Sequence, residues 1–250
     1  MADFKMNAGE VLIAGLNAMQ YAFESHKDKE NVKNMELFRQ AAIHMPVTKM
    51  DRGIYYRARI IKDSDGEETG IIRNSRGEPI SGYNIQYSGA PSEDKVIENG
   101  RVNRIGESVL YIAEDEETSC KEQKPNETDY LSVAKCAFNC DINVMDFTFT
   151  TSKELDTIFT ENVISYFEAS DNCDIRALYI FICNYFTSPN FKDIDYDTTL
   201  NLLDIIKQRK DISGVKYFSS YTKKYNIALW DDNRYSKCTD SKVKGPALHD

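Results

Sequence analysis

The segment that decides the fold covers residues 100–125 and reads GRVNRIGESVLYIAEDEETSCKEQKP. It opens with a glycine turn that carries Arg101 and Asn103. The apolar run SVLYIA comes next, contains Tyr111 and is typical of a buried strand. The first half of the segment therefore predicts a turn that leads directly into a strand.

The second half of the same segment predicts a short helix. Asp115 suits the N-cap position, because two glutamates follow it in the first turn, where the helix dipole favours acidic side chains. Pro125 ends the helix. On this helix Glu122 would share a face with Thr118 and Ser119, small residues that leave room for a ligand. We therefore expect the turn, the strand and the helix to present an arginine, a tyrosine and a glutamate to one cleft.

The composition is that of a globular protein. The chain has 250 residues, of which 41% are hydrophobic and 28% charged. A net charge of -9 argues against a protein that binds nucleic-acid backbones, since such proteins usually carry a basic face. No apolar run approaches the roughly 20 residues of a membrane span, and the N-terminus lacks the pattern of a signal peptide, so we expect a cytoplasmic protein without membrane contact.

The cysteines and histidines predict no metal site. The six cysteines include no CxxC pair and are interpreted as small buried hydrophobic residues. The three histidines lie far apart in the sequence, so neither a histidine metal site nor a Ser-His-Asp triad can be assembled from them.

The order of predicted elements indicates an α+β fold. Apolar residues at helical spacing predict helices over 8–25 and 31–43, which would pack on the rest of the protein or on a second copy in a homo-oligomer. A polar connection over 62–99 separates the strand-like run GIYYRARII from the opening segment. Strands are then predicted at DYLSVAKCAF and INVMDFTF, helices over 152–168, 174–186 and 197–208, and two last strands at GVKYFS and NIALW. Two groups of strands with helices between them favour α+β over a regular βαβ alternation.

Three segments concentrate polar side chains against an apolar background: YYRAR, the opening segment and GVKYFSS. Together they suit a dinucleotide. An arginine fork binds two phosphate oxygens at once, and an aromatic ring stacks on a base. A carboxylate accepts hydrogen bonds from ribose hydroxyls and stabilises the positive charge that develops when a glycosidic bond breaks.

The order of these segments resembles the RES-domain family, toxins of bacterial toxin–antitoxin pairs. Many members carry a YRAR strand, a GAPP segment, GRANPPGIPYLYLA running into ETALAEVRP, and a final DGIxYPSS…N strand pair. The corresponding stretches here are YYRAR, the run from SGAPSED to KEQKP, and SGVKYFSSYTKKYNIALW. The resemblance covers roughly residues 52–231. It departs from the family pattern at Lys124, Ser213 and Phe218, which stand where many members have arginine, aspartate and proline.

The resemblance assigns roles residue by residue. It implies a catalytic set and a set that binds the dinucleotide. The catalytic set is Glu122, Arg101 and Tyr111. The binding set is Arg57, with Arg59 as the close alternative, together with Asn103, Ser219 and Ser220.

What the resemblance implies is an ADP-ribosyltransferase-like fold, with central mixed or antiparallel sheets flanked by helices, that consumes NAD. A RES domain would cover 51–232, after an N-terminal helical segment over 1–50 and before a polar tail over 233–250. Family members release nicotinamide by phosphorolysis or hydrolysis, with inorganic phosphate as the co-substrate in the first case, and need no metal. The usual partner is a Xre-like helix-turn-helix antitoxin. Two alternatives remain: an ADP-ribosyltransferase that modifies a protein, and a non-catalytic interaction module.

Overall fold

The computed structural model describes Met45 and residues 47–138, 140–148, 200, 203–222, 224–230 and 236–245. The chain forms two compact units, the first made of Met1–Pro46 and Asp146–Lys210, the second of Val47–Met145 and Asp211–Asp250. In the first unit residues 203–206 are helical, within the helix predicted over 197–208. The helices predicted over 8–25, 31–43, 152–168 and 174–186 lie outside the described residues.

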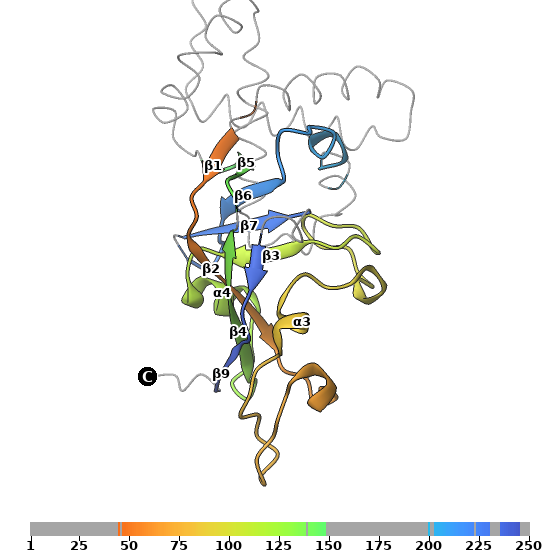
Figure 1. The fold of residues 1–250 in the computed structure, drawn as a ribbon, viewed down its shortest axis with the longest axis vertical. Coiled ribbons are helices and arrows are strands. Elements are labelled where there is room, and N and C mark those ends of the chain that lie inside the picture. Colours follow the sequence, from red (N-terminus) through yellow and green to blue (C-terminus); the bar gives the residue numbers. More distant parts are fainter. Residues whose placement is uncertain are drawn as a thin grey trace, which may run out of the picture. The chain divides into compact units, whose positions relative to one another are not determined.

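One sheet is the basis of the second unit (Figure 1). Its strands are β1 (Val47–Met50), β2 (Ile54–Ile60), β3 (Leu110–Ala113), β4 (Leu131–Phe138), β5 (Ile142–Asp146), β6 (Gly214–Phe218), β7 (Tyr225–Leu229), β8 (Ser236–Cys238) and β9 (Lys242–Lys244). They are arranged in the order β1-β5-β6-β7-β3-β2-β4-β8, and β9 also pairs with β4. Antiparallel pairing joins β1 to β5, β6 to β7, β7 to β3, β3 to β2, and β4 to β2, β8 and β9.

The helices of this unit are short. They are α3 (Ile85–Ser88), α4 (Glu116–Glu122) and the 3-10 turns η2 (Glu67–Thr69) and η3 (Glu93–Lys95). The α+β prediction is confirmed, and so are the strands predicted at the positions of β2 to β7. The helix predicted after Asp115 is α4.

Alternation along the strands builds a different packing layer on each face of the sheet. Leu110 and Ile112 of β3 are fully buried in the main core, together with Ile227 and Leu229 of β7. Ala58 of β2 and Leu131 and Val133 of β4 form a second cluster, which includes Cys120 of α4. This cluster fixes α4 against β2 and β4.

The polar tail predicted over 233–250 contains two strands of the sheet, β8 and β9. In addition, Cys136 and Cys238 form a disulfide, so their interpretation as unpaired buried cysteines is wrong. The two residues are direct partners in the register of β4 and β8, at a sequence separation of 102. Cys120 keeps a buried thiol and Cys140 a partly buried one.

The part of the chain that the structure describes contains no helix long and apolar enough to cross a membrane. Within the same residues, no group of three or more His, Cys, Asp and Glu side chains could hold a metal ion.

Candidate active site

The cleft lies where the sheet divides. Strands β2 and β3 are neighbours, yet within the described residues they pair at one position, Tyr56 with Ala113. The strands make no further pair on the side of residues 57–59, which follow it on β2, and 111–112, which precede it on β3, and these residues line a cleft of about 340 Å³. This volume is within the range of about 300–1,000 Å³ that is usual for ligand sites. The lining residues are Arg57, Ala58, Arg59, Arg101, Tyr111, Ile112, Ala113, Ser119, Glu122, Gln123, Tyr217 and Asn226.

Three guanidinium groups and one carboxylate line this cleft, in a chain whose net charge is -9. Arg57 and Arg59 come from β2, where positions i and i+2 share a face. The sequence analysis put one of the two in the site, whereas the structure brings both to the cleft. This concentration of positive charge suits an anionic ligand with several oxygen atoms.

Arg59 is held in place by an aromatic residue and a carbonyl. Its Nη1 atom donates a hydrogen bond to the carbonyl oxygen of Tyr87 at 2.7 Å. Its guanidinium carbon lies 4.7 Å from the centre of the Tyr83 ring. Burial and a hydrogen bond to Asp65 raise the pKa of Tyr83, so this ring stays neutral under the cation. These two contacts therefore restrict the orientation of the Arg59 side chain.

The turn that presents Arg101 is tied to Tyr111. The Tyr111 hydroxyl donates to Asn103 Oδ1 at 2.8 Å and accepts from the Val102 amide at 2.8 Å. Gly100 completes this turn, because a Cβ atom there would lie 2.2 Å from Asn103 Oδ1 and 3.0 Å from the Tyr111 hydroxyl. The Tyr111 ring thus lines the cleft while its hydroxyl fixes the turn.

The Arg101 side chain lies over an aromatic ring of the next hairpin. Its guanidinium carbon is 5.2 Å from the centre of the Tyr217 ring on β6. Tyr217 itself lines the cleft and is buried. A cation above an aromatic face is attracted to it, so the pair restricts where Arg101 can reach.

Glu122 lies at the C-terminal end of α4 and faces the cleft. Asn226 of β7 donates from Nδ2 to Glu122 Oε1 at 2.7 Å. Asn226 is 4% exposed, so its amide is held by the sheet and in turn fixes the carboxylate. Ser119, one turn earlier on α4, lines the cleft as well. Of the two small residues that were predicted to share a face with Glu122, Ser119 lines the cleft with it, whereas Thr118 does not.

The other end of α4 is anchored to the sheet and to the β6–β7 loop. Asp115 accepts a hydrogen bond from the Thr118 amide at 2.7 Å, and this bond holds the pKa of the Asp115 carboxyl below its usual value. The Thr118 and Thr222 hydroxyls are 2.9 Å apart, and Lys224 pairs with Glu114 at 3.2 Å. These contacts fix the direction in which the helix carries Glu122.

Three predicted binding residues lie outside the lining of the cleft. Asn103 is 6% exposed and uses its amide within the turn, donating to the carbonyl oxygens of Glu98 and Arg104. Ser219 is buried and accepts a hydrogen bond from the Tyr221 amide, which closes the β6–β7 loop. Ser220 belongs to the same loop. Their direct contact with a ligand stays a prediction.

Among the lining residues that the sequence analysis did not single out, Asn226 and Tyr217 contact predicted catalytic residues. Asn226 corresponds to the asparagine that closes the DGIxYPSS…N pattern, so the signal was present in the motif. Tyr217 corresponds to the tyrosine of that same pattern. Both were passed over because neither type suggests catalysis until its partner, Glu122 or Arg101, is known.

Comparison with known proteins gives the family. The RES domain model matches residues 76–246, more than half of the chain. The chain belongs to the RES domain family. The match includes Arg101, Tyr111 and Glu122, whereas Arg57 and Arg59 lie before its first residue.

One solved structure is similar to this RES chain, the crystal structure of the M. tuberculosis MbcT-MbcA toxin-antitoxin complex. The sequence identity is 12%, the TM-score is 0.44, and the similarity covers 85% of this chain and 94% of that chain. No curated protein matches the chain.

Proposed function

We propose that this RES domain is an NAD-consuming enzyme that cleaves the bond between nicotinamide and ribose, by phosphorolysis or hydrolysis. One observation carries the proposal. A carboxylate fixed by a buried amide, Glu122 with Asn226, lies in the same cleft as three arginine side chains. A dinucleotide that carries a pyrophosphate, and whose glycosidic carbon becomes positively charged as its bond to nicotinamide breaks, needs both kinds of group.

The carboxylate would act at the bond that breaks. When the C–N bond of NAD is cleaved, its electron pair moves to the ring nitrogen and leaves neutral nicotinamide. Positive charge then builds on C1′ of the ribose, and a fixed carboxylate stabilises it. Asn226 occupies Oε1 of Glu122, and we assign the second carboxylate oxygen to the ribose hydroxyls.

The arginines would bind the phosphates. Arg59 and Arg101 are each supported by an aromatic ring, so little side-chain entropy is lost when they bind an anion. In phosphorolysis an oxygen of inorganic phosphate attacks C1′ and gives ADP-ribose 1-phosphate. In hydrolysis water attacks, ADP-ribose forms and a proton is released. A cleft with three arginines suits the first acceptor, because it can hold a second anion beside the pyrophosphate.

The proposal is tested by incubating the full chain with NAD, with and without inorganic phosphate, and separating the products. We expect nicotinamide to be released and ADP-ribose or its 1-phosphate to accumulate. Glu122→Gln should lower the rate at least a hundredfold, about the effect of removing one electrostatic contact in a transition state. Glu117→Gln is the matched control, because Glu117 lies on the same helix but is exposed and pairs with Lys121.

Unchanged NAD after prolonged incubation with phosphate present would contradict the proposal. So would a Glu122→Gln variant that is as active as the Glu117→Gln control. Transfer of ADP-ribose from labelled NAD to a protein would instead identify the ADP-ribosyltransferase alternative. Binding of NAD without any turnover would identify the interaction module.

An enzyme that depletes NAD harms the cell that makes it. We therefore propose that the chain is the toxin of a toxin–antitoxin pair in the bacterial cytoplasm, and that a Xre-like helix-turn-helix antitoxin inhibits it. The family membership supports this proposal. Co-expression with the product of an adjacent gene should restore growth that the chain alone arrests, and the Glu122→Gln variant should not arrest growth.

A further inference from the structure

An edge segment, residues 236–245, runs antiparallel along β4. At its start Cys238 pairs with Cys136, and at its end Lys244 pairs with Leu131. Between these parts three residues, 239–241, lie opposite two residues of β4, which is the arrangement of a β-bulge. A bulge redirects the side chain that it contains, here Ser241.

Ser241 connects the edge segment to residues 82–88. Its amide and its hydroxyl both donate to the carbonyl oxygen of Tyr83, at 3.0 and 2.9 Å, and the hydroxyl also contacts that of Ser132. The backbones touch at Gly82, where a Cβ atom would lie 2.6 Å from the Ser241 carbonyl oxygen. The edge segment therefore contacts the backbone of Tyr83, the residue whose ring lies under the Arg59 guanidinium, and Val243 of the segment packs on the same cluster as Tyr87, whose carbonyl accepts from Arg59.

The same segment also contacts α4. Lys242 pairs with Glu116 at 2.7 Å, and Lys244 lies 3.8 Å from the same carboxylate. Glu116 is the first residue of the helix that ends in Glu122. The edge segment thus contacts the surroundings of two residues that line the cleft, Arg59 of β2 and Glu122 of α4.

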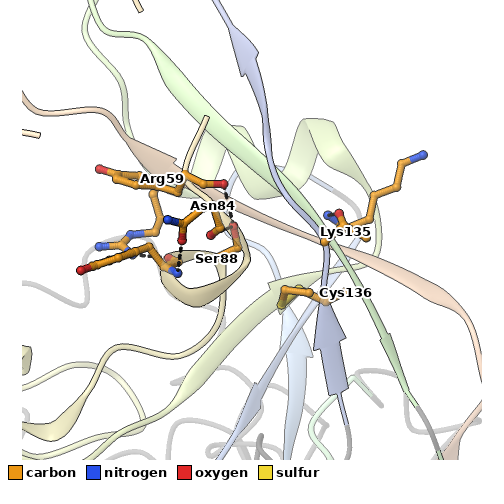
Figure 2. The surroundings of a disulfide bond; sticks show 9 residues. Arg59, Asn84, Ser88, Lys135 and Cys136 are labelled. Atoms are coloured by element: carbon orange, nitrogen blue, oxygen red, sulfur yellow. Dashed lines mark hydrogen bonds between the residues drawn. A yellow bond between two sulfur atoms is a disulfide. The ribbon is translucent and has the colours of Figure 1, made fainter. Parts of the chain in front are cut away.

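The disulfide links the edge segment covalently to β4. β8 lies at the edge of the sheet and pairs with β4 through three residue pairs. Short edge strands open easily, because one side of their backbone has no partner strand. The Cys136–Cys238 bond closes the start of the segment (Figure 2). Both cysteines are buried, at 0% and 8% exposure. Figure 2 draws Arg59, Asn84 and Ser88 in the surroundings of this bond.

We propose that the Cys136–Cys238 disulfide is a redox switch that controls the geometry of the cleft through the edge segment. The inference rests on the proposed function for its effect on catalysis. When the bond is intact, the edge segment stays on β4 and holds Arg59 and α4. When it is reduced, the segment opens, and Arg59 and Glu122 lose part of their support.

The chemistry of the switch is thiol–disulfide exchange. A dithiol reductant transfers two electrons and two protons to the bond, so that Cys136 and Cys238 become thiols and the reductant becomes a disulfide. In the reverse direction a small disulfide accepts the two electrons, and its two halves leave as thiols. Local opening of β8 gives the reductant access to the buried sulfur atoms.

The test compares the oxidised and the dithiol-reduced full chain, with thiol alkylation and mass spectrometry to establish the state of each cysteine. Amide hydrogen exchange is read over 82–88, 116–122 and 236–245. We expect reduction to speed exchange about tenfold or more in all three stretches. We also expect KM for NAD to rise about tenfold, the effect of loosening one charged hydrogen bond.

Variants separate the switch from other effects of the reductant. Cys238→Ser should behave like the reduced chain and no longer respond to the dithiol. Cys140→Ser removes a thiol without touching the disulfide and should respond as the parent chain does. Should Cys238→Ser fail to fold, the reversible reduction of the folded parent chain supplies the same comparison.

Two results would overturn the inference. The first is an oxidised chain in which mass spectrometry finds Cys136 and Cys238 unbonded. The second is unchanged exchange over 82–88 and 116–122 after both thiols have been alkylated. Because exchange is measured without NAD, failure of the proposed enzymatic activity leaves this test of the switch intact.

Discussion

Replacing Tyr111 by Phe removes one oxygen atom that holds two buried groups. The hydroxyl bridges the Val102 amide and Asn103 Oδ1, each at 2.8 Å. Val102 is 0% exposed and Asn103 is 6% exposed, so both groups would lose a partner in a site that is largely closed to water. A buried polar group without its hydrogen bond costs about 1–3 kcal/mol.

The expected loss of stability is therefore about 2–6 kcal/mol for the two groups together. In a domain of this size each kcal/mol lowers Tm by about 2–4 °C, so a fall in Tm of at least about 4 °C should be measurable by thermal unfolding. The turn that carries Arg101 would also loosen. We expect KM for NAD to rise about tenfold, equivalent to about 1.4 kcal/mol of binding energy.

The control for this experiment is Tyr130→Phe, because the Tyr130 hydroxyl makes no hydrogen bond within the part of the chain that the structure describes. The Phe variant at Tyr111 keeps the ring that lines the cleft. If the free energies of unfolding of Tyr111→Phe and Tyr130→Phe differ by less than about 0.5 kcal/mol, and the two variants bind NAD equally well, the hydroxyl does not hold the turn and only the ring matters.

Three further predictions follow from the contacts of the second unit. Asn226→Ala removes the donor to Glu122 and should lower kcat about tenfold to a hundredfold with little change in KM, measured by steady-state kinetics; a change in KM alone would contradict the positioning role. Cys136→Ser opens a bridge between residues 102 apart in the sequence, and the free energy of unfolding measured in urea should fall by about 2–5 kcal/mol. An unchanged unfolding midpoint would mean that the bond does not form. The folded-state pKa of Asp115 is lowered by its capping bond, so its contribution is present above the usual pKa of 3.8 and is lost as pH falls through the folded value. Asp115→Asn keeps the cap without the charge, and its stability measured between about pH 2 and pH 5 should depend less on pH than that of the parent chain.

Local signals in the sequence predicted the elements that bear the cleft. Alternation and β-branched or aromatic residues are sufficient to predict β2, β3 and β4, because these signals lie within each strand. The cap at Asp115 fixed the start of α4 and thereby the face on which Glu122 lies. Such features depend only on residues that are close together in the chain, so they can be predicted from a single sequence.

The parts that were missed depend on contacts between distant residues. The disulfide and the strands β8 and β9 follow from the register against β4, and residues 102 apart carry no shared local pattern. The cleft exists because β2 and β3 pair at only one position within the described residues. Neither the composition nor the hydrophobic periodicity of a sequence predicts where two strands stop pairing. The i, i+2 spacing of Arg57 and Arg59 places both on one face of β2, but the sequence does not show which face of the strand meets the cleft.

The division between β2 and β3 has a consequence for how variants of this protein should be designed. A sheet that parts in its middle has two additional edges, and an unpaired edge can add a strand from another chain and seed aggregates. Arg57 and Arg59 place charge and bulk on one of these edges. A variant in which both are replaced by small apolar residues would lose colloidal stability together with any bound anion. Exchange of one arginine at a time for lysine keeps the charge that protects the edge while it removes the fork that recognises phosphate.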